Sequence, residues 1–211
     1  MAAVRRALVT GGGSGIGAAV VRQLAQAALQ VVVADRDAAA AQAVASACGA
    51  VACTLDVTDF AAVNACVATQ GPFGVLVNGA GADQHAFFTR TGPDDWRALL
   101  AVNLEAVLHT THAVLPAMQD AGYGRIVNIA SEAGRLGSRG GAVYAAAKGG
   151  VIAFTRSIAR ENGTRGITAN VVVPGPIDTP MVRKAVAEGG DKLMAAMVGT
   201  TLVGRLGTPA E

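Results

Sequence analysis

The chain has 211 residues, enough for one domain of ordinary size, and its 52% hydrophobic and 15% charged residues exclude a disordered chain. The net charge of +2, with no lysine and arginine cluster interleaved with aromatic residues, argues against nucleic acid as a partner. No uninterrupted apolar run approaches the about 18 to 20 residues that cross a bilayer, so we expect no membrane segment.

Short apolar runs alternate with longer segments of helical period, and glycine, asparagine or aspartate follows each run. Such runs predict parallel strands that helices cover on both faces. The predicted strands are 7–10, 31–34, 50–55, 75–78, 125–130 and 167–173. The predicted helices are 15–28, 37–47, 59–68, 94–118 and 143–161, with a shorter candidate at 191–198. This order predicts a single-domain α/β protein with a doubly wound parallel sheet, the Rossmann fold, whose ligands bind at the carboxyl ends of the strands.

The first predicted strand runs directly into the glycine-rich segment 10–17 and then into a helix. Glycines there permit a tight turn and let backbone N–H groups approach a pyrophosphate at the helix N-terminus. The spacing is G-x-x-x-G-x-G through Gly11, Gly15 and Gly17, although the looser G-x-G-x-x-A form also fits from Gly13 to Ala18. A plain glycine turn after a strand is the alternative that this segment leaves open.

The second predicted strand is followed by an acidic and then a basic residue. Asp35 stands where a carboxylate can accept hydrogen bonds from a ribose 2'-hydroxyl and would repel a 2'-phosphate. Arg36 could instead cradle a 2'-phosphate, or form a surface salt bridge. We therefore expect NAD as the cofactor in preference to NADP.

Tyr144 and Lys148 lie four residues apart in a predicted helix, so their side chains share one face. A tyrosine with a pKa of about 10 cannot act as a base near neutral pH unless its phenolate is stabilised, and a nearby ammonium can stabilise it. A lowering of two or three units requires roughly 3 to 4 kcal/mol from the cation. A tyrosine and a lysine four residues apart often occur by chance. The residues around them therefore decide whether this pair is catalytic.

Two polar residues supply that context. Ser131 follows the fifth predicted strand, where its hydroxyl can meet a substrate oxygen. Asn103 lies inside the long fourth predicted helix, where asparagine is locally unfavourable. A helix kink or a hydrogen bond to the backbone would explain Asn103 without chemistry, and for this residue alone that alternative stays open.

These residues, in this order, resemble the short-chain dehydrogenase/reductase (SDR) family. The resemblance spans residues 10–179 and implies the Rossmann fold, a nicotinamide cofactor and four catalytic residues. One departure is Gly79, where the family more often has a second asparagine, and we expect a looser turn there. The segments that carry the resemblance are 10–17, 56–57, 78–81, Asn103, 126–131, 144–148 and 174–179.

The resemblance assigns a role to each catalytic residue. Tyr144 would be the general acid or base at the substrate oxygen. Lys148 would lower the pKa of Tyr144 and bind the nicotinamide ribose. Ser131 would orient and polarise the carbonyl, while Asn103 would hold a water that relays protons between Lys148 and solvent.

The resemblance also implies contacts along the cofactor. Asp56 and Val57 would contact adenine, segment 78–81 would pass under the adenosine ribose, and Ile177 and Thr179 would contact the carboxamide. The residues expected to bind the cofactor are Gly11, Gly13, Ser14, Gly15, Ile16, Gly17, Asp35, Arg36, Asp56, Val57, Asn78, Ala80, Gly81, Tyr144, Lys148, Pro174, Gly175, Ile177 and Thr179.

Within the family, segments 112–118, 124–135, 142–154 and 166–179 look most like 2-hydroxycyclohexanecarbonyl-CoA dehydrogenases and less closely like 3-oxoacyl-[acyl-carrier-protein] reductases. This likeness implies a small-molecule secondary alcohol or ketone as substrate, with a CoA thioester as one candidate. We expect the substrate pocket to draw on Gln84, His85, Phe88, Glu132, Ala133 and 181–197.

The remaining reactive residues predict little chemistry. Cys48, Cys53 and Cys66 are odd in number and form no C-x-x-C pair, so we expect buried, unreactive thiols. His109 and His112 have a spacing that can hold a metal, but no acidic or cysteine partner is near, so we expect no metal site. The apolar stretch near the N-terminus is too short for a signal-peptide core, so we expect a cytoplasmic protein.

Two expectations concern assembly and length. In the family the long helix that carries both histidines packs against its twin, so we expect a homodimer or homotetramer. Segment 206–211 resembles the start of a helix that in this family leads to a seventh strand. We therefore expect residues 1–211 to form one domain that lacks its last helix and strand.

Together these observations predict an NAD(H)-dependent oxidoreductase that interconverts a secondary alcohol and a ketone by hydride transfer. Neither a metal nor a covalent intermediate is required. An NADPH-dependent 3-oxoacyl-[acyl-carrier-protein] reductase is the enzymatic alternative, which Asp35 opposes. A non-catalytic dinucleotide-binding scaffold or sensor is the alternative from another class, which the presence of all four catalytic residues opposes.

Overall fold

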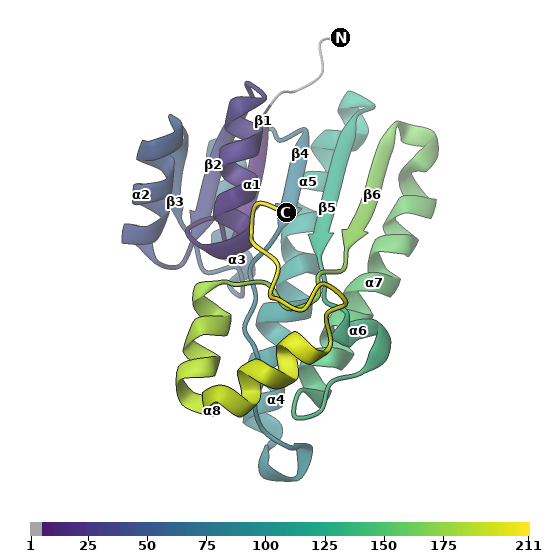
Figure 1. Cartoon of the computed structure of the whole chain (residues 1–211). Coiled ribbons are helices and arrows are strands. Elements are labelled where there is room, and N and C mark those ends of the chain that lie inside the picture. Colours follow the sequence, from purple (N-terminus) through teal and green to yellow (C-terminus); the bar gives the residue numbers. More distant parts are fainter. Residues whose placement is uncertain (1–5) are drawn as a thin grey trace.

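Residues 6–211 are described by a computed structural model. Their strands form one parallel sheet in the order β3-β2-β1-β4-β5-β6, with helices on both faces (Figure 1). This is a doubly wound sheet, so the fold predicted from the sequence is confirmed. The strands are β1 (Arg6–Thr10), β2 (Gln30–Asp35), β3 (Val51–Thr54), β4 (Val75–Asn78), β5 (Gly124–Ile129) and β6 (Ile167–Val172).

Two of the helices between the strands, α2 and α3, begin at a capping aspartate. Asp37 accepts a hydrogen bond from the backbone N–H of Ala40, and Asp59 accepts one from Ala62, so aspartates cap α2 and α3 as N-caps do. The helices are α1 (Gly15–Gln26), α2 (Ala38–Cys48), α3 (Phe60–Gln70), α4 (Pro93–Leu100), α5 (Ala106–Ala121), α6 (Ala133–Leu136), α7 (Ala142–Asn162) and α8 (Pro180–Gly199).

The predicted helix 94–118 is interrupted in the structure. A π-helical turn, Ala101–Glu105, joins α4 to α5, and Asn103 lies at its centre. The side-chain amide of Asn103 donates a hydrogen bond to the backbone oxygen of Leu99, 3.0 Å away. The widened turn gives the buried asparagine space, as π-bulges often do near functional sites.

The predicted short helix 191–198 is wrong in extent, because it is only the second half of α8. The start of α8 is set by Thr179, whose hydroxyl accepts a hydrogen bond from the N–H of Val182, and by Pro180 at the first helical position. Gly190 has a φ of +70° and divides the helix into two differently directed halves. The sequence contains this cap, Thr179 followed by Pro180, ahead of the predicted helix.

Side chains alternate along each strand and supply a core on each face of the sheet. Leu8 and Leu76 pack on the face covered by α3, α5 and α7. Val9 and Val77 pack on the opposite face against α1 and α2. Because a parallel sheet is covered on both faces, its strands need apolar residues at consecutive positions, which is the pattern that predicted them.

A chain of polar side chains crosses the core between β4 and β5. Thr110 donates to the side-chain oxygen of Asn78 at 2.7 Å, and the Asn78 amide donates to Asn128 at 2.8 Å. Asn128 in turn donates to the hydroxyl of Thr155 at 2.9 Å. All four residues are nearly inaccessible to solvent, so each depends on its neighbour to satisfy its hydrogen bonds.

Taken together, α4, the π-turn and α5 form a helical segment, Pro93–Ala121, that is long and apolar enough to cross a membrane by length and composition alone. We expected no such segment, and the difference arises because α4, the π-turn and α5 join end to end. Val114 and Met118 of this helix are buried in the core of the fold. The helix therefore packs against the sheet as part of the domain.

The expectation of three buried thiols is wrong for two of them. Cys66 is buried, whereas Cys48 and Cys53 are partly exposed, because Cys53 lies on the edge strand β3. The sulfur atoms of Cys53 and Cys66 are 3.2 Å apart. Burial, together with the neighbouring Cys53, raises the pKa of the Cys66 thiol to about 12, so that thiol is protonated at neutral pH.

We predict that Asn128→Ala destabilises the fold by about 1 to 3 kcal/mol, because the buried amide of Asn78 loses its acceptor. Urea unfolding would measure the change. The matched control is Asn64→Ala on the exposed side of α3, where we expect a change within about 0.5 kcal/mol. An equal loss in both variants would contradict the importance of the buried polar chain.

Candidate active site

The backbone of the loop between β1 and α1 packs directly against the backbone of the turn after β4. Gly11 has a φ of +64°, and a Cβ there would lie 2.8 Å from the backbone of Ala80 in the turn after β4. A Cβ on Gly17 would lie 2.1 Å from the carbonyl oxygen of Gly11. Both positions therefore require glycine. The N-cap residue Ser14 makes no capping hydrogen bond, so the start of α1 presents a hydroxyl and the positive end of a helix dipole.

Asp35 at the end of β2 is held against this glycine loop. One of its carboxylate oxygens accepts a hydrogen bond from the N–H of Gly13, and the other accepts one from Asp37, both at 3.0 Å. Each carboxylate oxygen can accept more than one hydrogen bond, so Asp35 keeps acceptor capacity for a ligand hydroxyl. The structure therefore fixes a negative charge beside the loop, where the sequence predicted it.

Asp56, beyond the end of β3, lies in the same region. The hydroxyl and backbone N–H of Thr58 hydrogen-bond to this carboxylate and lower its pKa, with a smaller contribution from the charge of Arg36. The side chain of Val57 is buried in the core, so only its backbone could contact a ligand. Asp35, Arg36 and Asp56 thus share one edge of the sheet.

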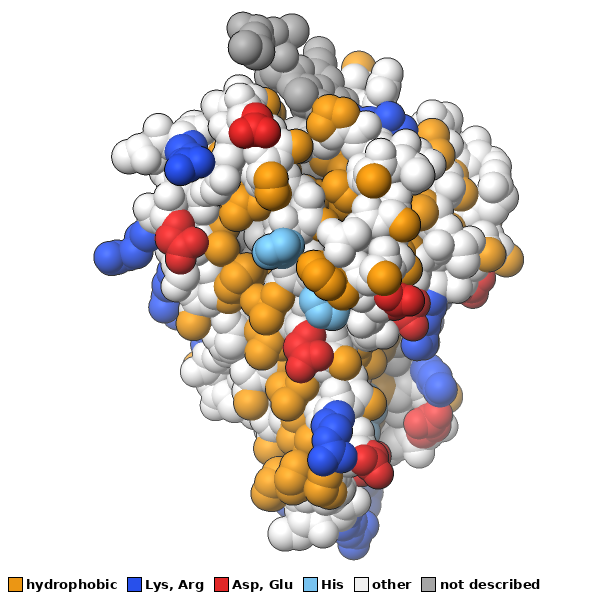
Figure 2. Space-filling model, turned by 180° about the vertical axis from the view of Figure 1, so that it is seen from behind, with side chains coloured by type: hydrophobic (Ala, Val, Ile, Leu, Met, Phe, Trp, Pro, Cys, Tyr) orange, Lys and Arg blue, Asp and Glu red, His pale blue; other side chains and the backbone are white. Residues whose placement is uncertain are grey.

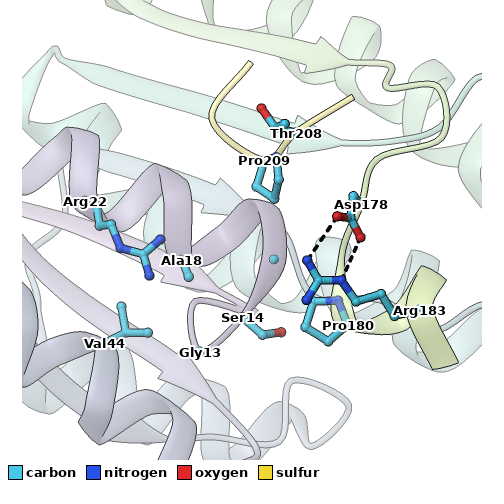
Figure 3. Close-up of a pocket in the computed structure, with 11 residues that line it drawn as sticks. Gly13, Ser14, Ala18, Arg22, Val44, Asp178, Pro180, Arg183, Thr208 and Pro209 are labelled. Atoms are coloured by element: carbon cyan, nitrogen blue, oxygen red, sulfur yellow. Dashed lines mark hydrogen bonds and ion pairs between the residues drawn. The ribbon is translucent and has the colours of Figure 1, made fainter. Parts of the chain in front are cut away.

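A hollow of about 450 Å³ opens beside the glycine loop (Figure 3). Arg183 closes one side through a two-pronged ion pair with Asp178, at 2.7 and 3.0 Å. Tyr144 is not among the lining residues, so this hollow adjoins the glycine loop and not the predicted catalytic residues. Its lining is Gly13, Ser14, Gly15, Ala18, Arg22, Val44, Asp178, Pro180, Arg183, Thr208 and Pro209.

The turn after β4 is held more firmly than expected. The hydroxyl of Thr10 accepts hydrogen bonds from the N–H groups of Gly79 and Ala80, at 3.2 and 3.4 Å. A Cβ on Gly79 would lie 2.9 Å from the Thr10 carbonyl oxygen, so this glycine tightens the turn, and the expected loosening is wrong. The side chain of Asn78 is committed to the buried polar chain, which leaves only its backbone to face a ligand.

Asn103 connects the π-turn to the loop after β4. Its side-chain amide donates to the backbone oxygen of Ala82 at 2.9 Å, and its side-chain oxygen accepts from the N–H of Ala82 at 3.2 Å. Gly81 lies directly beside it, since a Cβ there would be 2.9 Å from Asn103 Oδ1 and 3.5 Å from Lys148 Nζ. The kink and the backbone bond considered for Asn103 are both present, and they place it next to Lys148.

Tyr144, Ser131 and Lys148 meet at the carboxyl end of β5. Lys148 Nζ lies 5.7 Å from the centre of the Tyr144 ring and donates to the backbone oxygen of Ile129 at 3.0 Å. The Ser131 side chain lies close enough to Tyr144 to lower its pKa. The structure therefore brings together the four residues that the sequence predicted as catalytic.

The expected lowering of the tyrosine pKa is not what the structure shows. Burial raises the pKa of Tyr144, and the neighbouring Ser131 opposes this only in part. Burial also lowers the pKa of Lys148 to about 8. The Lys148 ammonium lies over the Tyr144 ring and donates to Ile129. The buried pair thus favours the neutral phenol near neutral pH.

A further charge at the site was not predicted from the sequence. The carboxylate of Asp83, in the loop after β4, acts on both buried groups and raises the pKa of Tyr144 and of Lys148. It lies 3.3 Å from the Nε2 atom of His85. Asp83 belongs to no recognisable motif, so only the folded loop shows that it faces the pair.

The segment after β6 packs onto the glycine loop. A Cβ on Gly15 would lie 3.1 Å from the Thr179 side chain. Ile177 pairs with Gly207 in a short parallel bridge, in which Asp178 N–H donates to Gly207 at 2.8 Å and Gly207 N–H donates to Pro176 at 3.0 Å. The hydroxyl of Thr179 caps α8. Segment 174–179 thus stands opposite the start of α1, as the predicted cofactor contacts require.

The two histidines of α5 form no metal site with their surroundings. Their rings pack against Phe60, at centre-to-centre distances of 5.1 Å for His109 and 5.6 Å for His112. Within residues 6–211, no three histidine, cysteine, aspartate or glutamate side chains come together as metal ligands.

The family model of short chain dehydrogenases matches residues 5–189. The chain belongs to this family. Its members bind a nicotinamide dinucleotide and act on alcohol and keto groups, so the chain is an oxidoreductase of this kind.

Individual relatives cover nearly the whole chain. Acetoacetyl-CoA reductase of Shinella zoogloeoides is 41% identical over 98% of this chain and 87% of its own length. The 3-oxoacyl-[acyl-carrier-protein] reductase of Escherichia coli is 37% identical over 97% of this chain and 85% of its own. A solved structure titled as an NAD(P)-dependent gluconate 5-dehydrogenase from Beutenbergia cavernae, with bound NADP, has a TM-score of 0.90 and 33% identity, covering 99% of this chain and 86% of that one.

The residues of the dehydrogenase site fit a nicotinamide dinucleotide. Gly13 and Gly15 carry no side chain at the start of α1, and the hydroxyl of Ser14 between them makes no capping hydrogen bond. Asp35 stands at one end of this loop, while segment 174–179 stands across from it. Lys148 and Tyr144 lie farther along the same edge of the sheet, beyond Gly81.

We predict that Asp83→Asn lowers the pKa of Tyr144, because the carboxylate of Asp83 raises it. Tyr123→Phe leaves Tyr144 as the single tyrosine, so ultraviolet titration of tyrosinate in that background reports this residue alone. Asp94→Asn, at a fully exposed side chain paired with Arg97, is the control and should leave the titration unchanged. A pKa that stays the same or rises in Asp83→Asn would show that the charge does not act on Tyr144.

Proposed function

We propose that the chain is an NAD(H)-dependent oxidoreductase that interconverts a secondary alcohol and a ketone, with Tyr144 moving the proton. The observation that carries this proposal is the group of Tyr144, Ser131 and the buried Lys148 at the same sheet edge as the glycine loop. Hydride leaves or enters at the nicotinamide C4 when the cofactor is bound.

Each residue of the group has a defined task in this reaction. The partly buried Tyr144 holds its proton at neutral pH, so in the reductive direction it donates that proton to the carbonyl oxygen. Ser131 can hydrogen-bond the same oxygen and orient it. In the oxidative direction Tyr144 must accept a proton as phenolate, and the charge of Lys148 then has to offset the cost of burial.

Lys148 and Asn103 supply the positioning and the proton path. Lys148 is held by Ile129 and lies beside Gly81, from where its ammonium can reach a ribose hydroxyl. Asn103 is fixed by Ala82 next to Lys148, and in this proposal it holds a water that connects Lys148 with solvent.

For the substrate we propose a small secondary alcohol or ketone carried as a CoA thioester, of which 2-hydroxycyclohexanecarbonyl-CoA is one candidate. Support comes from the similarity to acetoacetyl-CoA reductase. A 3-oxoacyl-[acyl-carrier-protein] reductase that uses NADPH is the second candidate, favoured by the likeness to the Escherichia coli reductase. Parallel assays of hydroxyacyl-CoA compounds with NAD and of a 3-oxoacyl-[acyl-carrier-protein] with NADPH, each followed by the absorbance of the reduced cofactor, would separate the two candidates.

A non-catalytic scaffold or sensor would also bind a dinucleotide. The glycine loop and Asp35 suit that function as well as they suit an enzyme. The partly buried tyrosine and the buried lysine do not, because removing ionisable groups from solvent costs free energy and binding a dinucleotide does not require it. The turnover experiment below distinguishes the two functions.

We also propose a cytoplasmic homodimer or homotetramer. Free cysteines suit a reducing compartment. Figure 2 shows hydrophobic side chains spread over the face that includes α4 and α5, with most charged side chains at its margins. Phe60 is 42% exposed on this face and packs with His109 and His112, which gives a second copy an apolar surface to cover.

We predict that Tyr144→Phe lowers turnover at least about 10³-fold while NADH still binds, because only the proton-carrying oxygen is removed. NADH-dependent ketone reduction and NADH fluorescence would measure the two effects. Tyr123→Phe is the matched control, since Tyr123 packs under Arg125 away from the site, and it should retain full activity. Turnover that survives Tyr144→Phe would refute the mechanism.

We predict that NADH supports at least about tenfold higher kcat/KM than NADPH, because the Asp35 carboxylate repels a 2'-phosphate. Asp35→Asn should narrow this ratio by removing the charge. If Arg36 instead cradles a 2'-phosphate, Arg36→Gln will selectively weaken NADPH use. A wild-type preference for NADPH would overturn the assignment of NAD.

A further inference from the structure

The catalytic helix α7 begins without a local cap. Gly141 occupies its N-cap position and has no side chain to accept a hydrogen bond from the first turn. Every α-helix starts with backbone N–H groups that lack partners within the helix. Other helices of this fold solve the problem locally, as Asp37 and Asp59 do for α2 and α3.

The first turn of α7 is capped instead by Gln84, from the loop after β4. The side-chain oxygen of Gln84 accepts hydrogen bonds from the N–H groups of Val143 at 3.0 Å and Tyr144 at 3.2 Å. These are the second and third helical positions, the ones that a conventional N-cap side chain serves. The amide of Gln84 donates to the backbone oxygen of Ala86 at 3.3 Å, and the residue is only 7% exposed.

The loop that carries Gln84 is itself anchored beside the catalytic group. Asn103 binds both the N–H and the carbonyl of Ala82, two residues before Gln84. The loop is also fixed at Gln84 itself, because the backbone N–H of Gln84 donates a hydrogen bond to the Asp83 carboxylate at 2.8 Å. Gln84 therefore binds α7 from a loop that Asn103 of the π-turn holds in place.

We propose that Gln84 is a positioning residue that fixes Tyr144 through the backbone of α7. The sequence suggested Gln84 as a pocket residue, but its side chain is turned to the helix. Its hydrogen bond goes to the N–H of Tyr144 itself, so loss of the acceptor frees the residue that moves the proton. Displacing a catalytic group by about 1 Å can cost on the order of 10²-fold in rate.

The test compares two substitutions of similar size. Gln84→Met removes the acceptor, whereas Gln84→Glu keeps two acceptor oxygens and loses only the 3.3 Å bond to Ala86. Gln42→Met, at an exposed glutamine of α2 that bonds Ser46, is the control for the substitution itself. All variants are made in the full chain, with thermal unfolding measured for each.

The first readout does not depend on activity. In the Tyr123→Phe background, tyrosinate titration follows Tyr144, whose proton affinity is set by burial, Ser131 and Asp83, with Lys148 adjacent. In Gln84→Met, Tyr144 gains solvent, so its pKa should fall toward the ordinary value of about 10. In Gln84→Glu, the added carboxylate should raise the pKa of Tyr144 further, as the carboxylate of Asp83 does.

The second readout is catalytic and rests on the proposed function. We expect Gln84→Met to lower kcat on the order of 10²-fold with NADH binding within about twofold of the wild type. Gln84→Glu should restore kcat to within about tenfold and shift the pH profile upward. The Gln42→Met control should match the wild type in both readouts.

Two results would overturn the proposal. One is an unchanged Tyr144 titration and kcat in Gln84→Met. The other is an equal loss of stability and NADH binding in Gln84→Met and Gln84→Glu, which would make Gln84 a structural residue only. Failure of the proposed function is separately visible, because Tyr144→Phe would then leave turnover intact while the titration still tests Gln84.

Discussion

The carboxyl edge of the sheet depends on one steric constraint, the lack of space for side chains between the glycine loop and the turn after β4. A Cβ on Gly17 would meet the carbonyl of Gly11, and a Cβ on Gly11 would meet Ala80. Because the two backbones touch, Thr10 can hold the turn with its hydroxyl. The turn then places Gly81 next to Lys148. The position of the reactive group therefore depends on the glycines of the loop and the turn, where side chains would not fit.

Burial sets the electrostatic character of the reactive group. It pushes Tyr144 and Lys148 toward their neutral forms, while Asp83 raises the pKa of both. Asp83 therefore supports the charge of Lys148 and opposes the phenolate of Tyr144. Tyr144 is therefore set to give a proton, and taking one requires additional stabilisation of the phenolate.

Local signals made much of the fold and site predictable from the sequence. Apolar runs marked the strands, aspartates marked the starts of α2 and α3, and the glycine spacing marked the loop before α1. Tyr144 and Lys148 were recognisable because a helix repeats nearly every four residues. The spacing fixed which side chains share a face, but it carried no information about how deeply they would be buried, so the direction of the Tyr144 pKa shift was missed.

The features that sequence reasoning missed are contacts between distant segments. Nothing near Asn78 indicates that its side chain is bound to Thr110 and Asn128. Likewise, no local pattern shows that Gln84 caps a helix that begins some 60 residues later. Such bonds depend on which loops the folded sheet brings side by side, and this information exists only once the topology is formed.

The short bridge between Ile177 and Gly207 has a thermodynamic consequence for the hollow beside the glycine loop. One wall of that hollow, around Asp178 and Arg183, is joined to residue 207 by two backbone hydrogen bonds outside the main sheet. Such a wall can open locally at a smaller free energy than the unfolding of the core. A ligand that contacts both walls would have its affinity reduced by the ordering of this segment, so stiffening the bridge is a route to tighter binding without any new contact to the ligand.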